Sequence, residues 1–166
     1  AILSRGLGDV YKRQPFTPVD LLEFKTFSSM QIAFFWLAMQ YGMSMLFVGG
    51  TASGKTTSLN ACSLFLPWQH KIVSIEETRE LNLPHPNWIP GCTRQGFGGE
   101  SAGSGVKAAG EVDMYDLLRA ALRERPEYII VGEIRGAEAY VLFQAMATGH
   151  TTYSCLLYTS DAADDA

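Results

Sequence analysis

The fold is decided by one stretch, Met45-Leu46-Phe47-Val48-Gly49-Gly50-Thr51-Ala52-Ser53-Gly54-Lys55-Thr56-Thr57. The apolar run Met45–Val48 predicts a buried strand, and the glycine-rich segment after it predicts a turn that opens a helix near Lys55. Gly49 and Gly54 permit backbone torsions that other residues resist. Such a turn directs several backbone N–H groups, together with the positive end of the helix dipole, at one point, which suits an anionic phosphate.

The same stretch matches the phosphate-loop pattern G-x-x-x-x-G-K-T. Lys55 supplies a mobile positive charge for the β- and γ-phosphates, and the Thr56 hydroxyl is a ligand for Mg²⁺. We therefore expect ATP and Mg²⁺ as cofactors. A glycine-rich turn without a ligand is the alternative, but it leaves Lys55 unexplained. The residues expected to bind the nucleotide are Gly49, Gly50, Thr51, Ala52, Ser53, Gly54, Lys55, Thr56 and Thr57.

Two further apolar runs end in acids. Tyr128–Val131 is followed by Gly132 and Glu133, and a carboxylate there can hold Mg²⁺ or its water beside the phosphate loop. Many buried strands end in an acid, so the acid at this position indicates a Mg²⁺ contact only in combination with the phosphate loop. Ile72–Ile75 is followed by Glu76, which could orient and deprotonate the attacking water. The alternative is a solvated acidic turn that pairs with Arg79.

Two other polar residues are weaker candidates. His150 precedes the predicted strand Thr151–Ser154, and a histidine near the phosphates could sense the γ-phosphate or donate to it. A structural hydrogen bond is the alternative. Arg135 follows Glu133 closely and could contact a phosphate or lie at an interface.

Predicted helices and short apolar strands alternate along the chain. The predicted strands are Met45–Val48, Lys71–Ile75, Tyr128–Val131 and Thr151–Ser154. The predicted helices cover 17–25, 29–41 with a capping box at Ser28–Gln31, Lys55–Phe65, 113–124 with Asp113 as its cap, and Gly136–Ala147. The prolines of Leu81–Pro90 exclude regular helix, and Gly96–Gly110 predicts a flexible loop. This alternation predicts an α/β fold with a mainly parallel sheet flanked by helices.

Composition excludes several classes. With 47% hydrophobic and 18% charged residues, the chain can bury a core, and its net charge of −4 lacks the basic footprint of a nucleic-acid-binding protein. Cys62, Cys92 and Cys155 have no metal-type or paired spacing, so a reducing, cytoplasmic setting is expected. The apolar stretch Ile32–Val48 is too short and too interrupted to span a membrane, and no signal peptide is visible.

Both ends of the chain look foreign. Asp9–Gln14 can be encoded by GATGTGTATAAGAGACAG, and the reverse complement of that string, read from its second base with one further T, encodes Cys155–Ser160. The ends therefore resemble a translated transposon-end sequencing adapter, although a chance match of two short peptides is the alternative. We predict artefactual segments over 1–14 and 155–166, and a partial ATPase domain, truncated at both ends, over 15–154.

Taken in order, the motifs resemble those of the secretion-ATPase superfamily, which drives type II secretion, type IV pili, type IV secretion and the archaeal archaellum. The phosphate loop and three further segments look like its Walker A, Asp box, Walker B and His box; the latter three are Ser74–Glu80, Val131–Arg135 and Ala147–His150. The amino-acid sequence around these motifs is most similar to the archaeal archaellum and type IV pilus assembly branch. The similar segments are Arg79–Pro84, Asp113–Leu118 and Gln144–Ser154.

The resemblance implies a RecA-like domain in a homo-oligomeric, hexameric ring that binds ATP at subunit interfaces. ATP hydrolysis would assemble or move a membrane-anchored filament. The ring would act at the cytoplasmic face of the membrane, beside a polytopic inner-membrane platform protein. Carried over to this chain, Glu76 is the water-activating base, Glu133 supports the Mg²⁺ shell, and His150 couples to the nucleotide, with Lys55 completing the catalytic set. A nucleotide-gated binding module and a nucleic-acid-translocating RecA-like ATPase are the alternatives, and no nucleic acid is expected as a partner.

Overall fold

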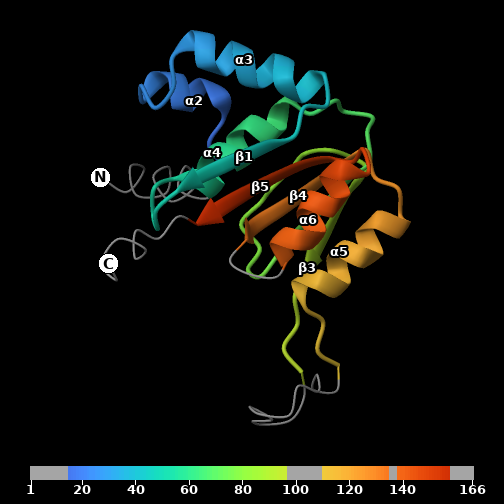
Figure 1. Cartoon of the computed structure of the whole chain (residues 1–166). Coiled ribbons are helices and arrows are strands. Elements are labelled where there is room, and N and C mark those ends of the chain that lie inside the picture. The colour runs from blue at the N-terminus through green and yellow to red at the C-terminus, as the bar shows by residue number, and fades with distance from the viewer. Residues whose placement is uncertain (1–14, 97–109, 135–137, 158–166) are drawn as a thin grey trace, which may run out of the picture.

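A computed structural model describes residues 15–96, 110–134 and 138–157, and these form an α/β domain around one all-parallel sheet. The five strands lie in the order β1-β5-β4-β2-β3 (Figure 1). Their bounds are Met45–Gly49 for β1, Ile72–Glu76 for β2, Trp88–Cys92 for β3, Tyr128–Ile134 for β4 and Thr151–Leu157 for β5. The predicted fold class is confirmed.

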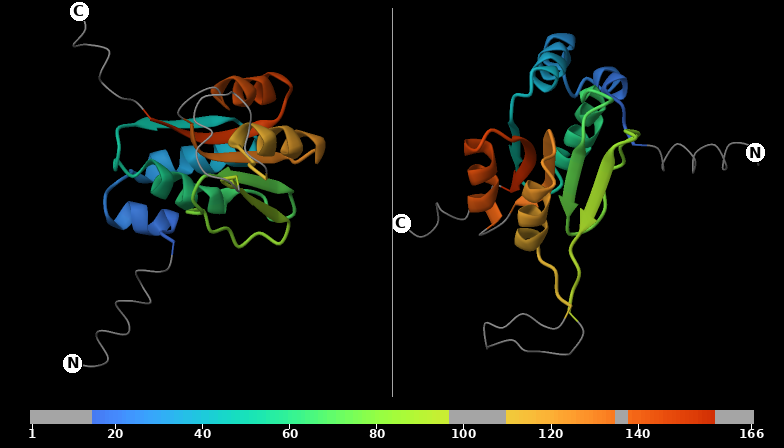
Figure 2. Two further views of the ribbon diagram at one scale, coloured as in Figure 1. Left: turned by 90° about the horizontal axis from the view of Figure 1, so that it is seen from below. Right: turned by 90° about the vertical axis from the view of Figure 1, so that its right-hand side faces the viewer.

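Helices cover both faces of the sheet (Figures 1 and 2). One face carries α2, α3 and α4, and the other carries α5 and α6. The bounds are Pro18–Glu23 for α2, Ser29–Gln40 for α3, Lys55–Cys62 for α4, Met114–Arg123 for α5 and Glu138–Ala147 for α6; a short 3₁₀ helix, Ser63–Phe65, follows α4.

Local sequence accounts for where the helices begin. The predicted capping box of α3 is present, because the Gln31 amide donates to Ser28 Oγ at 3.3 Å and Gln31 Oε1 accepts from the Ser28 amide at 2.8 Å. Asp113 caps α5 as predicted, by accepting from the Asp116 amide at 2.8 Å. Capping groups satisfy N–H donors that have no partner inside the helix.

Two apolar clusters lie on the two faces of the sheet, because successive strand residues point to opposite sides. On the α4 face, strand residues such as Ile72 and Ile130 pack with Leu59 of α4. On the other face, Ile129 and its neighbours pack with Leu118 of α5. The two clusters fix which strand residues face α4, and this decides which polar side chains can meet at the ends of the strands.

The prediction that β1 is a buried strand is wrong. Leu46 is 37% exposed and Val48 57% exposed, whereas Met45 and Phe47 pack against the α4-side cluster. β1 is an edge strand whose partner in the described sheet is β5, and none of the described helices covers its other face. Alternating burial is the expected pattern for a strand covered on one face alone.

β3 was not predicted, because it begins inside the proline-rich segment and contains Pro90. Proline lacks an N–H for the sheet and is tolerated on edge strands. β3 occupies the other edge of the sheet and pairs with β2. Trp88 anchors it by donating its indole N–H to Ser74 Oγ at 2.9 Å.

Other boundaries differ from those predicted. β4 continues to Ile134, so Glu133 lies inside the strand, and β5 continues to Leu157 with Cys155 fully buried. Nearly all of the loop predicted over Gly96–Gly110 lies outside the described residues, as do 1–14 and 158–166. Within the described ranges, no helix has both the length and the apolar character that crossing a bilayer requires.

Candidate nucleotide-binding site

The phosphate loop connects β1 to α4, as the sequence predicts. Gly54 has φ +84°, a left-handed conformation that favours glycine, and α4 begins at the next residue. At Gly49 the loop approaches closely for a different reason: a Cβ there would lie 2.7 Å from Ser53 Oγ, so any other residue would displace the Ser53 side chain. The loop therefore closes tightly onto itself before the helix begins. As in any helix, the first backbone amides of α4 have no partner within the helix and can bind an anion.

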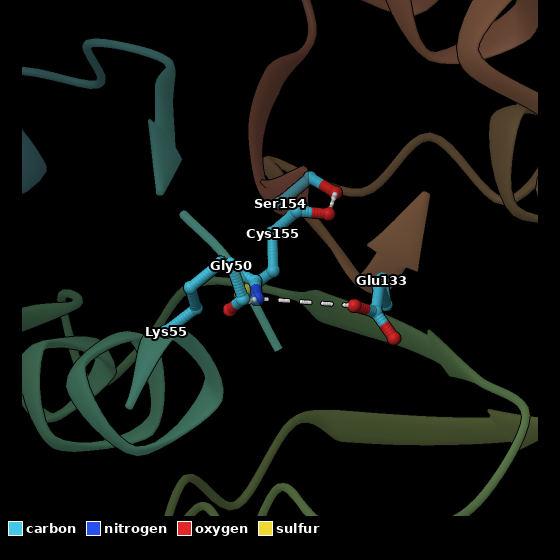
Figure 3. A network of polar contacts seen from close by, with 5 residues as sticks. All are labelled: Gly50, Lys55, Glu133, Ser154 and Cys155. Atoms are coloured by element: carbon cyan, nitrogen blue, oxygen red, sulfur yellow. Dashed lines mark hydrogen bonds and ion pairs between the residues drawn. The ribbon is translucent and has the colours of Figure 1, made fainter. Parts of the chain in front are cut away.

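Lys55 folds back over this loop. Its Nζ donates to the carbonyl oxygen of Gly50 at 2.7 Å and lies 3.9 Å from Glu133 Oε1 (Figure 3). The Lys55 side chain is 8% exposed and that of Glu133 is 29% exposed. A largely buried ammonium held by a carbonyl and a carboxylate can exchange these acceptors for an incoming phosphate, because all three contacts are electrostatic and of similar geometry.

The two candidate carboxylates lie on neighbouring strands. β2 pairs with β4, with Ile75 opposite Val131, so Glu76 and Glu133 come from adjacent strands. They line a single cavity of about 110 Å³ together with Thr56 at the start of α4. Parallel strands bring their carboxyl ends to one edge, where ligands bind in open α/β sheets. The structure thus brings Lys55 and Thr56 close to Glu76 and Glu133, two carboxylates that are distant from them in sequence.

Glu76 is almost fully enclosed, with 2% of its surface exposed. Its Oε1 accepts from the backbone amides of Glu80 and Leu81 at 3.0 and 2.9 Å. Its Oε2 is buried and has no hydrogen-bond partner among the described residues. The alternative of a solvated turn that pairs with Arg79 is wrong, because Glu76 is buried and the Arg79 guanidinium lies 5.1 Å from the centre of the Trp88 ring.

These side chains fit Mg²⁺ held mainly by water and nucleotide. Mg²⁺ prefers hard oxygen ligands and retains several waters, so it needs few protein groups. The Thr56 hydroxyl and the Glu133 carboxylate supply such oxygens at the cavity, and the unpartnered Glu76 oxygen leaves room for one more polar contact. No cluster of three or more His, Cys, Asp or Glu side chains able to cage a metal occurs in the described part of the chain.

The structure does not bring His150 to this site, which corrects the expectation that it lies near the phosphates. His150 precedes β5, and Thr151 donates its hydroxyl to the Gly42 carbonyl at 2.9 Å, just before β1 begins. The phosphate loop follows the end of β1, and β5, which is seven residues long, runs parallel to β1 over five of them. At about 3.3 Å per residue, the two ends of β5 are about 20 Å apart. Arg135 lies outside the described residues.

Three features of the site were missed in the sequence. The backbone amides of residues 80 and 81 donate hydrogen bonds to Glu76, and no pattern of side chains in the sequence predicts these bonds. Gly132 lets β4 approach Glu76, because a Cβ there would lie 3.1 Å from Glu76 Cγ; a glycine inside an apolar strand is a sequence signal for such a close approach. Cys155, which belongs to the segment 155–166 that we predict to be artefactual, lies next to the site (Figure 3), and burial, opposed by Thr56 and Lys55, raises the pKa of its thiol to about 11.

The sequence matches the family described as Type II/IV secretion system protein over residues 11–166. It is 52% identical over 139 residues to the uncharacterized protein MJ1287 of Methanocaldococcus jannaschii, an alignment covering 84% of this chain and 48% of the relative. It is 39% identical over 122 residues to the type IV secretion system protein PtlH of Bordetella pertussis, covering 71% of this chain and 33% of the relative. The chain thus spans half or less of the length of these relatives.

Solved structures share the fold. The VirB11 ATPase from the Brucella suis type IV secretion system, in complex with sulphate, matches with a TM-score of 0.62 and 29% identity over 90% of this chain and 41% of that one. The pilus retraction motor PilT with bound ADP matches with a TM-score of 0.52 and 28% identity, over 70% of this chain and 32% of that one.

Proposed function

The chain belongs to the type II/IV secretion system protein family, and from this premise we propose that it binds Mg·ATP and hydrolyses it as part of a longer secretion or pilus motor. The observation that carries the proposal is the convergence of Lys55, Thr56, Glu76 and Glu133 at one edge of the sheet. A cation, a hydroxyl and two carboxylates close together are the groups that phosphoryl transfer to water requires.

Each of these residues has a distinct role in the proposed reaction. The amides of Gly49–Gly54 and the Lys55 ammonium bind the phosphates, with Lys55 leaving the Gly50 carbonyl as it does so. Thr56 and Glu133 would hold Mg²⁺, through the hydroxyl of the first and the carboxylate of the second. Bound Mg²⁺ would neutralise the charge that develops on the phosphates. Glu76 accepts a proton from the attacking water through its unpartnered oxygen.

The comparisons support this assignment. The VirB11 structure holds sulphate, an anion similar to phosphate, and the PilT structure holds ADP. Both proteins are more than a quarter identical to this chain over most of its length. Because these two structures share the fold and hold a phosphate-like anion and a nucleotide, the same ligand class is proposed here.

We propose that the full-length protein assembles into a homo-oligomer, as a hexameric ring. It would act at the cytoplasmic face of the membrane on a polytopic inner-membrane platform protein, and drive a type IV pilus-like or archaellum filament or type II/IV secretion. Native mass spectrometry of a natural full-length protein containing this segment, with and without Mg·ATP, tests the ring. A strictly monomeric protein under both conditions contradicts it.

The decisive experiment is Glu76→Gln in that full-length protein. We expect phosphate release to fall by about 10²–10⁴-fold, the usual contribution of a general base, while the affinity for Mg·ATP stays within about twofold. Glu124→Gln, which changes an exposed carboxylate at the C-terminal cap of α5, is the matched control. Unchanged phosphate release in Glu76→Gln rejects the motor, whereas wild-type binding without any turnover favours a nucleotide-gated binding module.

We also propose that residues 1–14 and 155–166 do not belong to the natural protein, on the basis of their shared coding sequence. Cys155–Leu157 extend β5 in the structure, which apolar residues do whatever their origin. Amplifying the natural gene across both junctions and sequencing it tests the proposal. If the natural gene encodes these residues in place, the proposal fails.

A further inference from the structure

The orientation of Glu76 depends on the turn that follows β2. Two amides of that turn, those of Glu80 and Leu81, hold Oε1, while Oε2 is left without a partner among the described residues. One oxygen is therefore fixed by backbone amides, and the other is buried without a partner in a residue that lines the cavity. Any displacement of the turn moves the whole carboxylate with it.

A buried side chain of α4 anchors this turn. The amide of Asn82 donates to Asn60 Oδ1 at 3.1 Å, and Asn60 is 9% exposed. Burying an amide side chain is unfavourable unless it is hydrogen-bonded. On either side of Asn82, Leu81 and Leu83 are buried in the cluster that also contains Leu59 of α4. The turn is thus located relative to α4 by one polar contact and two apolar ones.

The same helix carries the phosphate-binding groups. α4 begins with Lys55 and Thr56, and Thr56 lines the cavity. Residues four apart lie on one face of a helix, so Asn60 lies one turn below Thr56 on the side facing Glu76. A continuous set of contacts therefore runs from Thr56 through the helix to Asn60, then to Asn82 and Glu76.

We propose that Asn60 is a positioning residue that keeps the Glu76 carboxylate in register with the phosphate-binding end of α4. This rests on the proposed function, because Glu76 acts only on a water beside a bound nucleotide. Asn60 does not line the cavity formed by Thr56, Glu76 and Glu133. It therefore affects the hydrolysis step through Glu76 and leaves nucleotide affinity unchanged.

The test compares two substitutions in the natural full-length protein. Asn60→Leu removes the acceptor and keeps the number and branching of the side-chain heavy atoms, and Asn60→Asp retains an acceptor oxygen. We expect Asn60→Leu to raise hydrogen exchange in peptides covering 79–83 by about tenfold, and to lower kcat by about tenfold or more with KM within twofold. Asn60→Asp should keep exchange near the wild-type rate and recover most of kcat.

A matched control separates this effect from general loosening of the helix. Ser63 follows α4, is fully buried and donates its hydroxyl to the Leu59 carbonyl at 2.7 Å, away from the turn. Ser63→Ala should leave exchange over 79–83 and kcat unchanged. If Asn60→Leu does not fold, Asn60→Ala removes the same acceptor without a bulky replacement.

The outcomes distinguish the two levels of the proposal. Unchanged exchange over 79–83 in the acceptor-free variant overturns the positioning role, as does a loss of nucleotide affinity equal to the loss of kcat. A wild-type protein that hydrolyses no ATP rejects the proposed function instead. Even then, the exchange measurement decides whether Asn60 anchors the turn that holds Glu76.

Discussion

Lys55 is the residue on which nucleotide affinity should depend most. Its Nζ already has two oxygen partners, the Gly50 carbonyl and Glu133, so the structure holds it at the loop without a ligand. Lys55→Ala should weaken Mg·ATP binding by about 10- to 100-fold, since hydrogen bonds to charged groups contribute about 1.5–3 kcal/mol. Calorimetric titration of the full-length protein with Mg·ATP measures the effect.

Lys71→Ala is the control for this prediction. Lys71 carries the same charge, but it comes just before β2 begins, at the amino-terminal ends of the strands. Its Nζ lies 3.4 Å from Glu124 Oε2. Its loss should leave affinity within about twofold, since exposed ion pairs contribute little. Equal losses in the two variants would show that overall charge, not the loop, governs binding.

The cysteines should differ in reactivity at the residue scale. Burial raises the pKa of the Cys62 thiol from its ordinary value of 9.0 to about 12, whereas Cys92 is exposed. Because the thiolate is the reactive form, native Cys92 should react with a thiol reagent at pH 8 while Cys62 reacts only after unfolding. Mass spectrometry of the alkylated protein, with and without denaturant, checks this.

The same shift has a consequence for stability. The pKa of Cys62 is higher in the folded state than in the unfolded state. The contribution of its protonated thiol to the free energy of unfolding is therefore fully present below pH 9, and it is lost as the pH rises from 9 towards 12. Cys62→Ala should therefore flatten the decline of stability in this pH range. Denaturant unfolding at pH 8 and pH 10 measures it, and an unchanged decline would contradict the prediction.

At the scale of the element, α3 depends on its capping box. Ser28→Ala removes the oxygen that accepts from the Gln31 amide and should lower the free energy of unfolding by about 1 kcal/mol. Ser29→Ala, at the next and equally exposed position, is the control and should change it by less than about 0.5 kcal/mol. Equal effects in a denaturant titration would show that the box does not stabilise the helix.

At the scale of the whole molecule, the parallel sheet separates the groups at the amino-terminal ends of its strands from those at the carboxyl-terminal ends. His150 lies at the amino-terminal edge, in a cavity of about 510 Å³ that also contains His70 and Arg125, and its Nδ1 lies 3.2 Å from Thr148 Oγ1. The proposed nucleotide site lies at the carboxyl-terminal ends of the strands. His150→Ala in this chain should therefore change Mg·ATP affinity by less than about twofold, because the sites are about 20 Å apart. A loss comparable to that of Lys55→Ala would contradict this geometry.

Local chemistry allowed much of this protein to be predicted from its sequence. The phosphate loop, the caps at Ser28 and Asp113, and the strands that end near Glu76 and Glu133 are all short-range patterns. Such patterns act through backbone torsions and neighbouring hydrogen bonds, so they persist wherever the chain is placed. They were sufficient for the α/β fold and for predicting that Thr56, Glu76 and Glu133 lie together.

Strand order and long-range packing decided the rest. Which strands lie at the edges determined that β1 is half exposed and that Pro90 can sit in β3. Parallel pairing put His150 at the far edge, and the packing of α4 on the sheet brought Asn60 to Asn82. These features depend on contacts between residues far apart in the chain, whose free energies no local pattern contains.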